Sequence, residues 1–549
     1  MKPTPSTASG GAAPRDAVSI LNDVLGPVMR GPSSSHTAAS YNIARAVAAL
    51  FGAQPASVRV SFDPSGSYGQ VYRQQGVDRA FATGLLGWSL TDPRFLGALE
   101  AAADAGIDLE FRLSPLTDPD HPNATDIRLS GPARSPLEVR ARSIGGGAIE
   151  ITRLAGWPVL LTGQAHEVIV ELAASAEASV RSLLSGDDHG IGEPSRQTRG
   201  GGVLLCAKRR RRLEPRTLAS LGAIGGVAHV YQMPALAFVK AGSPLFTSAA
   251  EMIALAEERH FTLGRLASEY ESRLLGISER EVGDEMARRF DVMHAAVREG
   301  LSDHVPGMQL LLPTASRIYR AEAEGRLALG GLHTRAAARA MGAMHVNSGM
   351  GVVCAAPTGG SSGVLPGVLA TLVDERGLSR EKAVLALLAA GAVGIIVAER
   401  ATFAAEIAGC QVEIGAAGAM AASAIVEAAG GTAAQAADAA AISFQNTMGS
   451  VCDLVQGVVE IPCHTRNAVA ASSAFVCADL VLGGYENPIP LDDTIDAVLA
   501  VGRMLPPELR VTSRGGLAVT PSALRLQRRR GGSDEGEEGR EGEEGREGE

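Results

Sequence analysis

The sequence predicts an α+β N-terminal part followed by a large, almost wholly helical C-terminal part. Short segments that alternate apolar and polar residues, as half-buried strands do, occur only in the first part. From Thr247 to about Leu524 apolar residues recur at helical spacing, with Gly- and Pro-rich breaks at 355–366, 409–418 and 485–490. A chain of 549 residues is long enough for three or four such domains.

The first elements form one predicted α+β domain over residues 16–157. Residues 1–15 precede it as a Pro-, Ser-, Gly- and Ala-rich leader that we expect to be disordered. The domain should contain two helices and four strands, each bounded by polar or turn-forming residues. The expected helices cover 16–25 and 37–51, and the expected strands cover 58–62, 109–111, 137–139 and 148–153.

The sequence pattern of residues 158–245 predicts a second, smaller α+β module. Its strand–helix–strand–helix–strand order suggests an ACT-like or ferredoxin-like arrangement. The expected elements cover 168–172, 177–184, 203–207, 216–221 and 227–232. The Gly- and Ser-rich segment 185–202 is predicted to be a loop. The basic run Lys208–Arg212 has no interleaved aromatic residue, which favours a solvated loop over a nucleic-acid contact.

The all-helical domain should cover residues 246–525 and be followed by a disordered acidic tail at 526–549. The formal net charge is −10, but residues 531–549 hold nine acidic residues and two arginines and contribute −7 of it. The remaining charge of about −3 provides no strong field for a charged macromolecule. The apolar run Ala383–Ala398 is shorter than a membrane-spanning helix needs and predicts a buried helix.

Six irregularly spaced cysteines do not form a disulfide scaffold, and the N-terminus lacks the apolar segment of a secretory signal. Both observations favour a reducing cytoplasm. Cys410, Cys452 and Cys463 lie 42 and 11 residues apart, each beside glycine, proline or a charged residue. Three thiolates can hold three irons of a [4Fe–4S] cluster and leave the fourth open to substrate. The alternative is three buried core cysteines, because no tight ferredoxin spacing is present.

Longer segments resemble the iron–sulfur L-serine dehydratase family. GCQVEIGAAGAMAA, CDLVQGVVEIPCHTRNAVAA and MHVNSGMGVVCAAPTGGSSGVLPG are similar to its α part, and LGPVMRGPSSSHTAAS is similar to its β part. The resemblance spans most of residues 16–525, in β-then-α order. It implies that Cys410, Cys452 and Cys463 are the cluster ligands. The other cysteines match no ligand position and are expected to be structural: Cys206, Cys354 and Cys477.

The segment Gly31–Thr37 opens a helix with three serine hydroxyls and free backbone N–H groups, which suit a carboxylate or phosphate. The resemblance implies that it binds the substrate carboxylate, and that loops 143–147, 347–349 and 356–363 line or close the same site. The residues expected to bind a small amino-acid substrate are Ser33, Ser34, Ser35, His36, Thr37, Gly146, Asn347, Ser348, Thr358 and Ser361.

Removing water from a β-hydroxy amino acid needs a base for the α-proton and help for the departing hydroxide. An open-iron cluster or pyridoxal phosphate can provide this help, and pyridoxal phosphate requires a Schiff-base lysine. The chain has only four lysines. Lys2 lies in the leader, Lys208 in the basic run, and Lys382 in the first turn of a helix. Lys240 lacks a neighbouring glycine-rich phosphate cup. We therefore expect no pyridoxal phosphate.

One departure from the family pattern concerns the base. Where the family has a GHxTD segment with a histidine that resembles a catalytic base, this chain has Gln75. Glutamine does not accept a proton usefully at neutral pH. His36 is the first candidate for that role, and His345 and His464 are alternatives. A second departure is that no cysteine follows Cys477, so capping of the open iron by a C-terminal cysteine is not expected.

The resulting hypothesis is a [4Fe–4S]-dependent enzyme that converts L-serine to pyruvate and ammonia. It should act in the cytoplasm as a homodimer, without nucleic-acid or membrane partners. A cluster-dependent L-cysteine desulfidase, or a dehydratase of another β-hydroxy amino acid, remains an alternative. A silent amino-acid sensor is a third possibility, against which the three cysteines argue.

Overall fold

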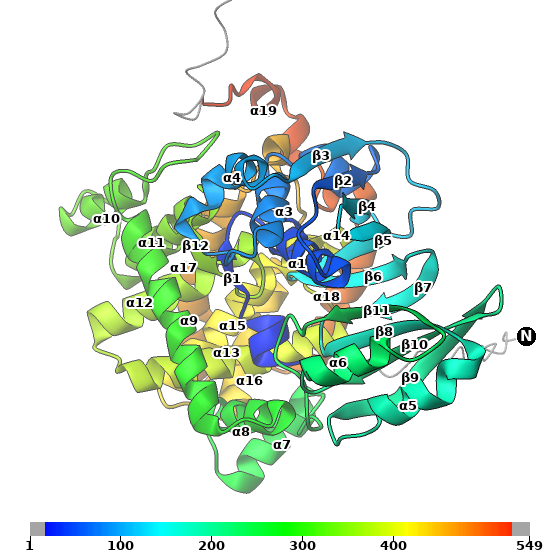
Figure 1. Cartoon of the computed structure of the whole chain (residues 1–549). Helices are drawn as coiled ribbons and strands as arrows, with labels where there is room; N and C mark the ends of the chain where they lie inside the picture. Colours follow the sequence, from blue (N-terminus) through cyan, green and yellow to red (C-terminus); the bar gives the residue numbers. More distant parts are fainter. Residues whose placement is uncertain (1–16, 530–549) are drawn as a thin grey trace, which may run out of the picture.

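The structure, a computed structural model, describes residues 17–529; the predicted leader and the tail beyond Arg529 lie outside the described residues. Within that part, two multistranded sheets come from the N-terminal half and helices form nearly everything that follows (Figure 1). The predicted fold class, an α+β part followed by an all-helical part, is confirmed.

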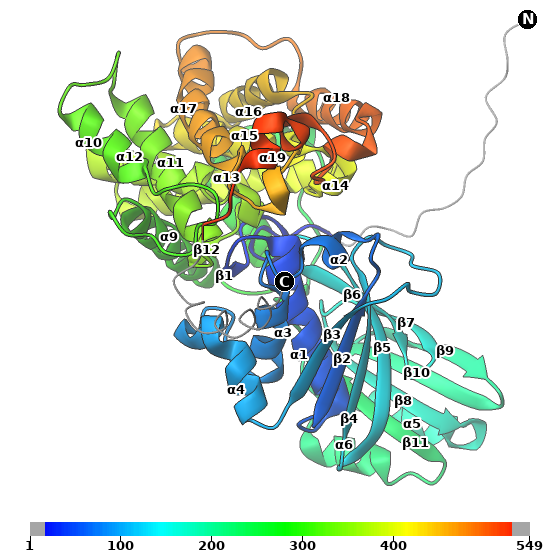
Figure 2. The same ribbon diagram turned by 90° about the horizontal axis from the view of Figure 1, so that it is seen from above.

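The larger sheet has six strands in the order β3-β2-β4-β5-β6-β7, parallel between β2 and β3 and antiparallel elsewhere. Val58, Val60 and Phe62 alternate into one core cluster with apolar residues of the helices on one side of the sheet (Figure 2). The elements of this part are α1 (Ala39–Phe51), β2 (Ser57–Phe62), α2 (Ser67–Val71), α3 (Val77–Leu85), α4 (Ala98–Asp104), β3 (Asp108–Leu113), β4 (Ala124–Gly131), β5 (Arg134–Gly145), β6 (Ala148–Leu154) and β7 (Trp157–Leu161).

The smaller sheet has the order β11-β8-β10-β9 and is antiparallel throughout. With its two helices it follows the β-α-β-β-α-β sequence of ferredoxin-like folds. The elements are β8 (His166–Ala173), α5 (Glu177–Leu184), β9 (Gly190–Arg199), β10 (Gly202–Arg209), α6 (Pro215–Gly222) and β11 (Val227–Met233).

Two sequence-based expectations fail in this module. The predicted loop 185–202 contains the strand β9, which pairs with β10 along the sheet edge. Most of its side chains are exposed, so it lacks the apolar alternation by which strands are identified. The basic run is not a solvated loop throughout, because Arg209 is buried and its guanidinium binds the Leu184 carbonyl (2.9 Å) and the Asp187 carboxylate.

The helical part begins at Ala249 and surrounds a core rich in alanine and glycine. Helix α15 is buried along almost its whole length, between its neighbours α13, α16 and α17. The helices are α7 (Ala249–Arg259), α8 (Leu263–Leu275), α9 (Glu279–Gly300), α10 (Ala315–Ala323), α11 (Leu332–Ser348), α12 (Val364–Arg376), α13 (Arg380–Arg400), α14 (Ala405–Ala408), α15 (Ile414–Ala428), α16 (Ala433–Thr447), α17 (Cys463–Leu482), α18 (Leu491–Met504) and α19 (Pro521–Arg525).

Helix α13 contains the predicted apolar run. It is long and apolar enough to cross a membrane, but 78% of its apolar window is buried inside the protein. Close packing explains its glycines: a β-carbon on Gly394 would lie 2.1 Å from Cγ1 of Val24. The short N-terminal turn Ile20–Val24, all that remains of the helix predicted at 16–25, thereby docks on the helical part.

The N-terminal segment is joined to the helical part by backbone pairing as well. Strand β1 (Val28–Arg30) pairs antiparallel with β12 (Val352–Cys354), more than 300 residues later in the chain. The helix predicted to begin at Thr37 begins at Ala39, because Ser34–Ala38 form a wider π-helical turn. The serine-rich segment thus follows directly after a strand anchored on the helical part.

Candidate functional site

The three predicted ligand cysteines are free, buried thiols on three separate loops or helix starts. Cys410 opens the turn after α14, Cys452 lies in the loop after α16, and Cys463 is the first residue of α17. Only 1, 2 and 4% of their surfaces, respectively, are exposed. The sulfur atoms of Cys410 and Cys452 and a carboxylate oxygen of Glu413 lie within 4.8 Å of one another.

Cys452 and Cys463 also face a small cavity of about 40 Å³, which we call the cysteine cavity. This volume corresponds to roughly two or three water molecules. The serine-rich segment and the helical part meet here, so the cavity combines residues from both halves of the chain. It is lined by Pro32, Ser33, Ser35, His36, Gln75, Gly360, Glu406, Glu413, Cys452, Leu454, Val459, Cys463 and Val511.

Backbone contacts hold the cysteines in place. The Cys452 amide donates to the Leu509 carbonyl (2.8 Å), and the Val511 amide donates to the Cys452 carbonyl (2.9 Å). Gly409, which precedes the first cysteine, has φ +74°, and a β-carbon there would lie 2.7 Å from the Ser450 carbonyl oxygen. Only glycine therefore fits this turn without strain.

A guanidinium lies beside the thiols. Arg466 donates to the Val451 carbonyl (2.7 Å) and the buried Asp453 carboxylate (3.0 Å), and it also hydrogen-bonds Cys410. A hydrogen bond with Cys452, assisted by Arg466, lowers the pKa of the Cys410 thiol. The hydrogen bond with Cys410, followed by burial, raises the pKa of Cys452. Burial, followed by the charge of Cys410, raises the pKa of Cys463.

These electrostatics provide a test of whether the residues fit a metal cluster. Without a metal, the Cys410 thiolate that the guanidinium stabilises raises the pKa of the neighbouring thiols Cys452 and Cys463, which therefore stay protonated. Three thiolates in one buried place require a positively charged partner such as iron. The set of sulfur donors therefore fits an iron–sulfur cluster bound by Cys410, Cys452 and Cys463.

Two carboxylates of the cavity were missed by the sequence analysis. Burial, followed by the charge of Cys410, raises the pKa of Glu413 well above its usual range. Burial also raises the pKa of Glu406, which accepts a hydrogen bond from the Ser35 hydroxyl (3.4 Å). Glu413 lies within the GCQVEIG segment, one helical turn after a cysteine, and this spacing was the available signal.

The serine-rich segment contributes Ser33, Ser35 and His36 to the cavity. Nδ1 of His36 lies 3.0 Å from the Ser35 hydroxyl, and its Nε2 lies 2.9 Å from the Ser67 hydroxyl. Burial lowers the pKa of His36 to about 4, so the ring is neutral at pH 7. Ser34 instead accepts a hydrogen bond from the Gly359 amide (3.3 Å), which joins the segment to the helical part.

The other predicted substrate-binding residues surround the cavity without lining it. Asn347 donates to the Pro32 carbonyl (3.1 Å), and Ser348 donates to the Val459 carbonyl (2.6 Å). Thr358 and Ser361 cap the turn before α12 and place Gly360 at the cavity.

Thr37 and Gly146, which were also predicted to bind the substrate, lie outside the cysteine cavity. Thr37 donates to the backbone carbonyl of Gln75 (2.8 Å) and so supports the cavity wall rather than facing it. Gly146 lines a separate, larger cavity that is bordered by α1 and α9.

The position of the missing family histidine does face the cavity. Gln75 is 2% exposed, and its Nε2 donates weakly to the Gly457 carbonyl (3.4 Å). Its Oε1 is buried and has no hydrogen-bond partner among the described residues. The two alternative histidines, His345 and His464, contact each other with ring centroids 5.1 Å apart and do not line the cavity.

None of the three described lysines lines the cysteine cavity. Lys208 lies in the strand β10 and Lys382 is exposed in the first turn of α13. Lys240 forms an ion pair with Asp23 at 3.2 Å.

Comparison with known proteins identifies relatives of both halves. Residues 222–518 match the serine dehydratase alpha chain family. The chain is 37% identical over 285 residues to a probable L-serine dehydratase alpha chain of Bacillus subtilis, covering 52% of this chain and 95% of that one. It is 35% identical over 285 residues to the L-serine dehydratase alpha chain of Peptoniphilus asaccharolyticus, covering 52% of this chain and 98% of the relative.

A relative of the other part is the probable L-serine dehydratase beta chain of Bacillus subtilis. It is 43% identical over 148 residues, which are 27% of this chain and 66% of the relative. Both chains of a two-chain relative thus find their counterparts in one polypeptide. The chain belongs to the iron–sulfur L-serine dehydratase family, with the β and α parts fused.

Proposed function

We propose that the protein dehydrates and deaminates L-serine to pyruvate and ammonia, using a [4Fe–4S] cluster held by Cys410, Cys452 and Cys463 and no pyridoxal phosphate. The observation that carries this proposal is that Cys452 and Cys463 line one cavity with the serine-rich segment, while the sulfur of Cys410 lies within 4.8 Å of that of Cys452. The names of the relatives support the substrate. When bound, a cluster with three thiolate ligands supplies an open iron as a Lewis acid for the departing hydroxyl.

The side chains of the cavity match the remaining groups of serine. Ser33 and Ser35 offer hydroxyl donors for the substrate carboxylate, and their segment begins a helix whose backbone N–H groups favour an anion. Among the described residues, no lysine or arginine lines the cavity. Glu413 offers a carboxylate for the ammonium group.

Removal of the α-proton requires a base in the cavity. His36 was the first candidate, but both of its ring nitrogens are hydrogen-bonded, and a pKa of about 4 makes it a weak base. Among the described residues Glu406 has no cationic partner, and burial raises its pKa, which strengthens it as a base. We therefore propose that Glu406 accepts the proton and that His36 orients Ser35.

The balanced sequence is short. The Cα–H bond breaks and its proton passes to Glu406, while the Cβ–O bond breaks and hydroxide leaves. The enamine that forms tautomerises to an imine, and water hydrolyses the imine to the keto acid and ammonia.

Anaerobic purification tests the proposal. We expect about four irons and four acid-labile sulfides per chain and release of pyruvate from L-serine. A panel of L-serine, L-threonine and L-cysteine distinguishes the alternatives: faster sulfide release from cysteine would identify a desulfidase, and a bound cluster without any turnover would favour a sensor. Full activity in metal-free protein would refute the cofactor assignment.

Thiolate ligands and an open iron suit a reducing compartment, so we also propose a cytoplasmic enzyme. The homodimer stays a prediction, which sedimentation of the anaerobic protein checks. We propose no nucleic-acid or membrane partner, because the charge outside the terminal acidic segment is small.

A further inference from the structure

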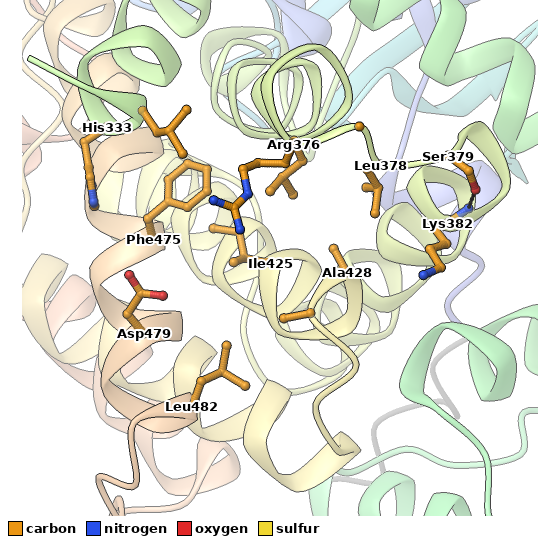
Figure 3. Close-up of a pocket in the computed structure, with 14 residues that line it drawn as sticks. His333, Arg376, Leu378, Ser379, Lys382, Ile425, Ala428, Phe475, Asp479 and Leu482 are labelled. Atoms are coloured by element: carbon orange, nitrogen blue, oxygen red, sulfur yellow. Dashed lines mark hydrogen bonds between the residues drawn. The ribbon is translucent and has the colours of Figure 1, made fainter.

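The helical part contains a second cavity, of about 720 Å³, far larger than the cysteine cavity. It lies where the last turns of α12, α15 and α17 meet the first turns of α11 and α13 (Figure 3). Its volume is within the range of about 300–1,000 Å³ that is typical of small-molecule sites.

One part of this cavity is apolar. Figure 3 shows Phe475 and Leu482 of α17 and Ile425 of α15 around its centre, and Leu378 lies at its edge. Water in contact with these side chains gains few hydrogen bonds, so an apolar ligand group that displaces it binds favourably. The ligand for this cavity should therefore carry an aliphatic or aromatic group.

The other part carries three charges without partners. Arg376, Lys382 and Asp479 line the cavity, and none forms an ion pair or side-chain hydrogen bond with another described residue. By contrast, Arg380, two residues before Lys382, forms an ion pair with Asp291. Figure 3 shows the Arg376 guanidinium near the centre of the cavity, with Lys382 and Asp479 on opposite sides of it.

We infer that this cavity is a binding site for a free α-amino acid with an apolar side chain. The ligand carboxylate pairs with Arg376, its ammonium group pairs with Asp479, and its side chain covers Phe475 and Ile425. This occupant uses the unpaired charges of Arg376 and Asp479 and the apolar surface together. Charge-assisted pairs of this kind are the stronger hydrogen bonds in proteins.

Other occupants fit less well. L-serine lacks an apolar side chain and would leave the apolar part of the cavity, around Phe475 and Ile425, in contact with water. The acidic segment 531–549 has carboxylates but no aliphatic or aromatic side chain. A fatty acid would leave Asp479 without a partner, and an alkylamine would leave Arg376 without one.

The location gives the site a physical connection to the cysteine cavity. Helix α15 begins directly after Glu413 and ends at Ala428, on this second cavity. Helix α17 begins at Cys463 and ends at Leu482, also on the second cavity. With 15 residues, α15 separates the two sites by about 22 Å, so the amino acid would bind remote from the proposed chemistry.

Saturation-transfer NMR on the anaerobic holoenzyme tests the inference with L-leucine. We expect a Kd on the order of 0.1–1 mM, as suits a ligand of few atoms. Two analogues isolate its charges: 4-methylpentanoate lacks the ammonium group and 3-methylbutylamine lacks the carboxylate. Each should bind at least tenfold more weakly than L-leucine. Equal binding of either analogue, or the absence of L-leucine binding, would overturn the assignment.

Variants locate the site. Arg376→Gln and Asp479→Asn should each weaken L-leucine binding by roughly 10-fold or more, because each leaves one ligand charge unpaired. Both side chains are exposed, so folding should be retained. Arg298→Gln, at another exposed arginine of the helical part, is the matched control and should bind as the parent does. Unchanged binding by Arg376→Gln, or full displacement of L-leucine by L-serine, would place the ligand elsewhere.

Discussion

Acid should destabilise this protein through His36, and the structure sets the size of the effect. The ring is 1% exposed, and burial lowers its pKa from 6.5 to about 4. In the unfolded chain the same ring takes up a proton near pH 6.5. The stability that follows from keeping the ring neutral is therefore present above pH 6.5 and is lost as the pH falls toward 4.

The magnitude follows from the two pKa values. Between pH 7.5 and pH 4.5 the unfolded state gains almost one proton that the folded state does not bind, which corresponds to about 2.5 kcal/mol of unfolding free energy. His36→Gln keeps a side chain that forms hydrogen bonds but does not titrate. The variant should therefore lose about 2.5 kcal/mol less stability than the parent over this pH range.

Urea unfolding at pH 7.5, 6.5, 5.5 and 4.5 measures the effect, with parent and variant in the same cluster state. Other titrating groups contribute equally to both proteins, so the difference between the two curves isolates His36. His304→Gln, at an exposed histidine, should follow the parent. Parallel curves for His36→Gln and the parent would refute a buried, neutral ring and, with it, the argument that His36 is too weak a base.

Three further predictions concern the site. Cys452→Ser should lose iron and the visible absorbance of the cluster, whereas Cys477→Ser should keep both; full iron content in Cys452→Ser would contradict the ligand assignment. Glu406→Gln should lower kcat by roughly 10²–10⁴-fold with the cluster spectrum unchanged, and an unaltered kcat in a keto-acid assay would exclude it as the base. Gln75→Leu removes the unpartnered Oε1 from the cavity and should raise KM for L-serine about 10-fold, whereas an unchanged KM would show that this atom does not contact substrate.

The sequence was most informative where one local pattern decides a structure. The helix Glu177–Leu184 has the predicted bounds, and the strands expected at 58–62 and 148–153 are present, because their apolar residues follow the period of the element. The edge strand β9 is a case in which the local sequence does not predict the element. Its side chains are mostly exposed, so hydrogen bonding to β10 holds it in place and its own sequence carries little signal.

For the site, the sequence alone determined the family and the candidate ligands, because Cys410, Cys452, Cys463 and the SSSHT segment are recognisable as local motifs. Only the tertiary structure decided what faces the same cavity. Glu406 comes from a short helix without a distinctive pattern, and it reaches Ser35 across 371 positions of the chain. Whether His36 is a base depends on its burial, which packing of distant segments creates and which local sequence does not encode.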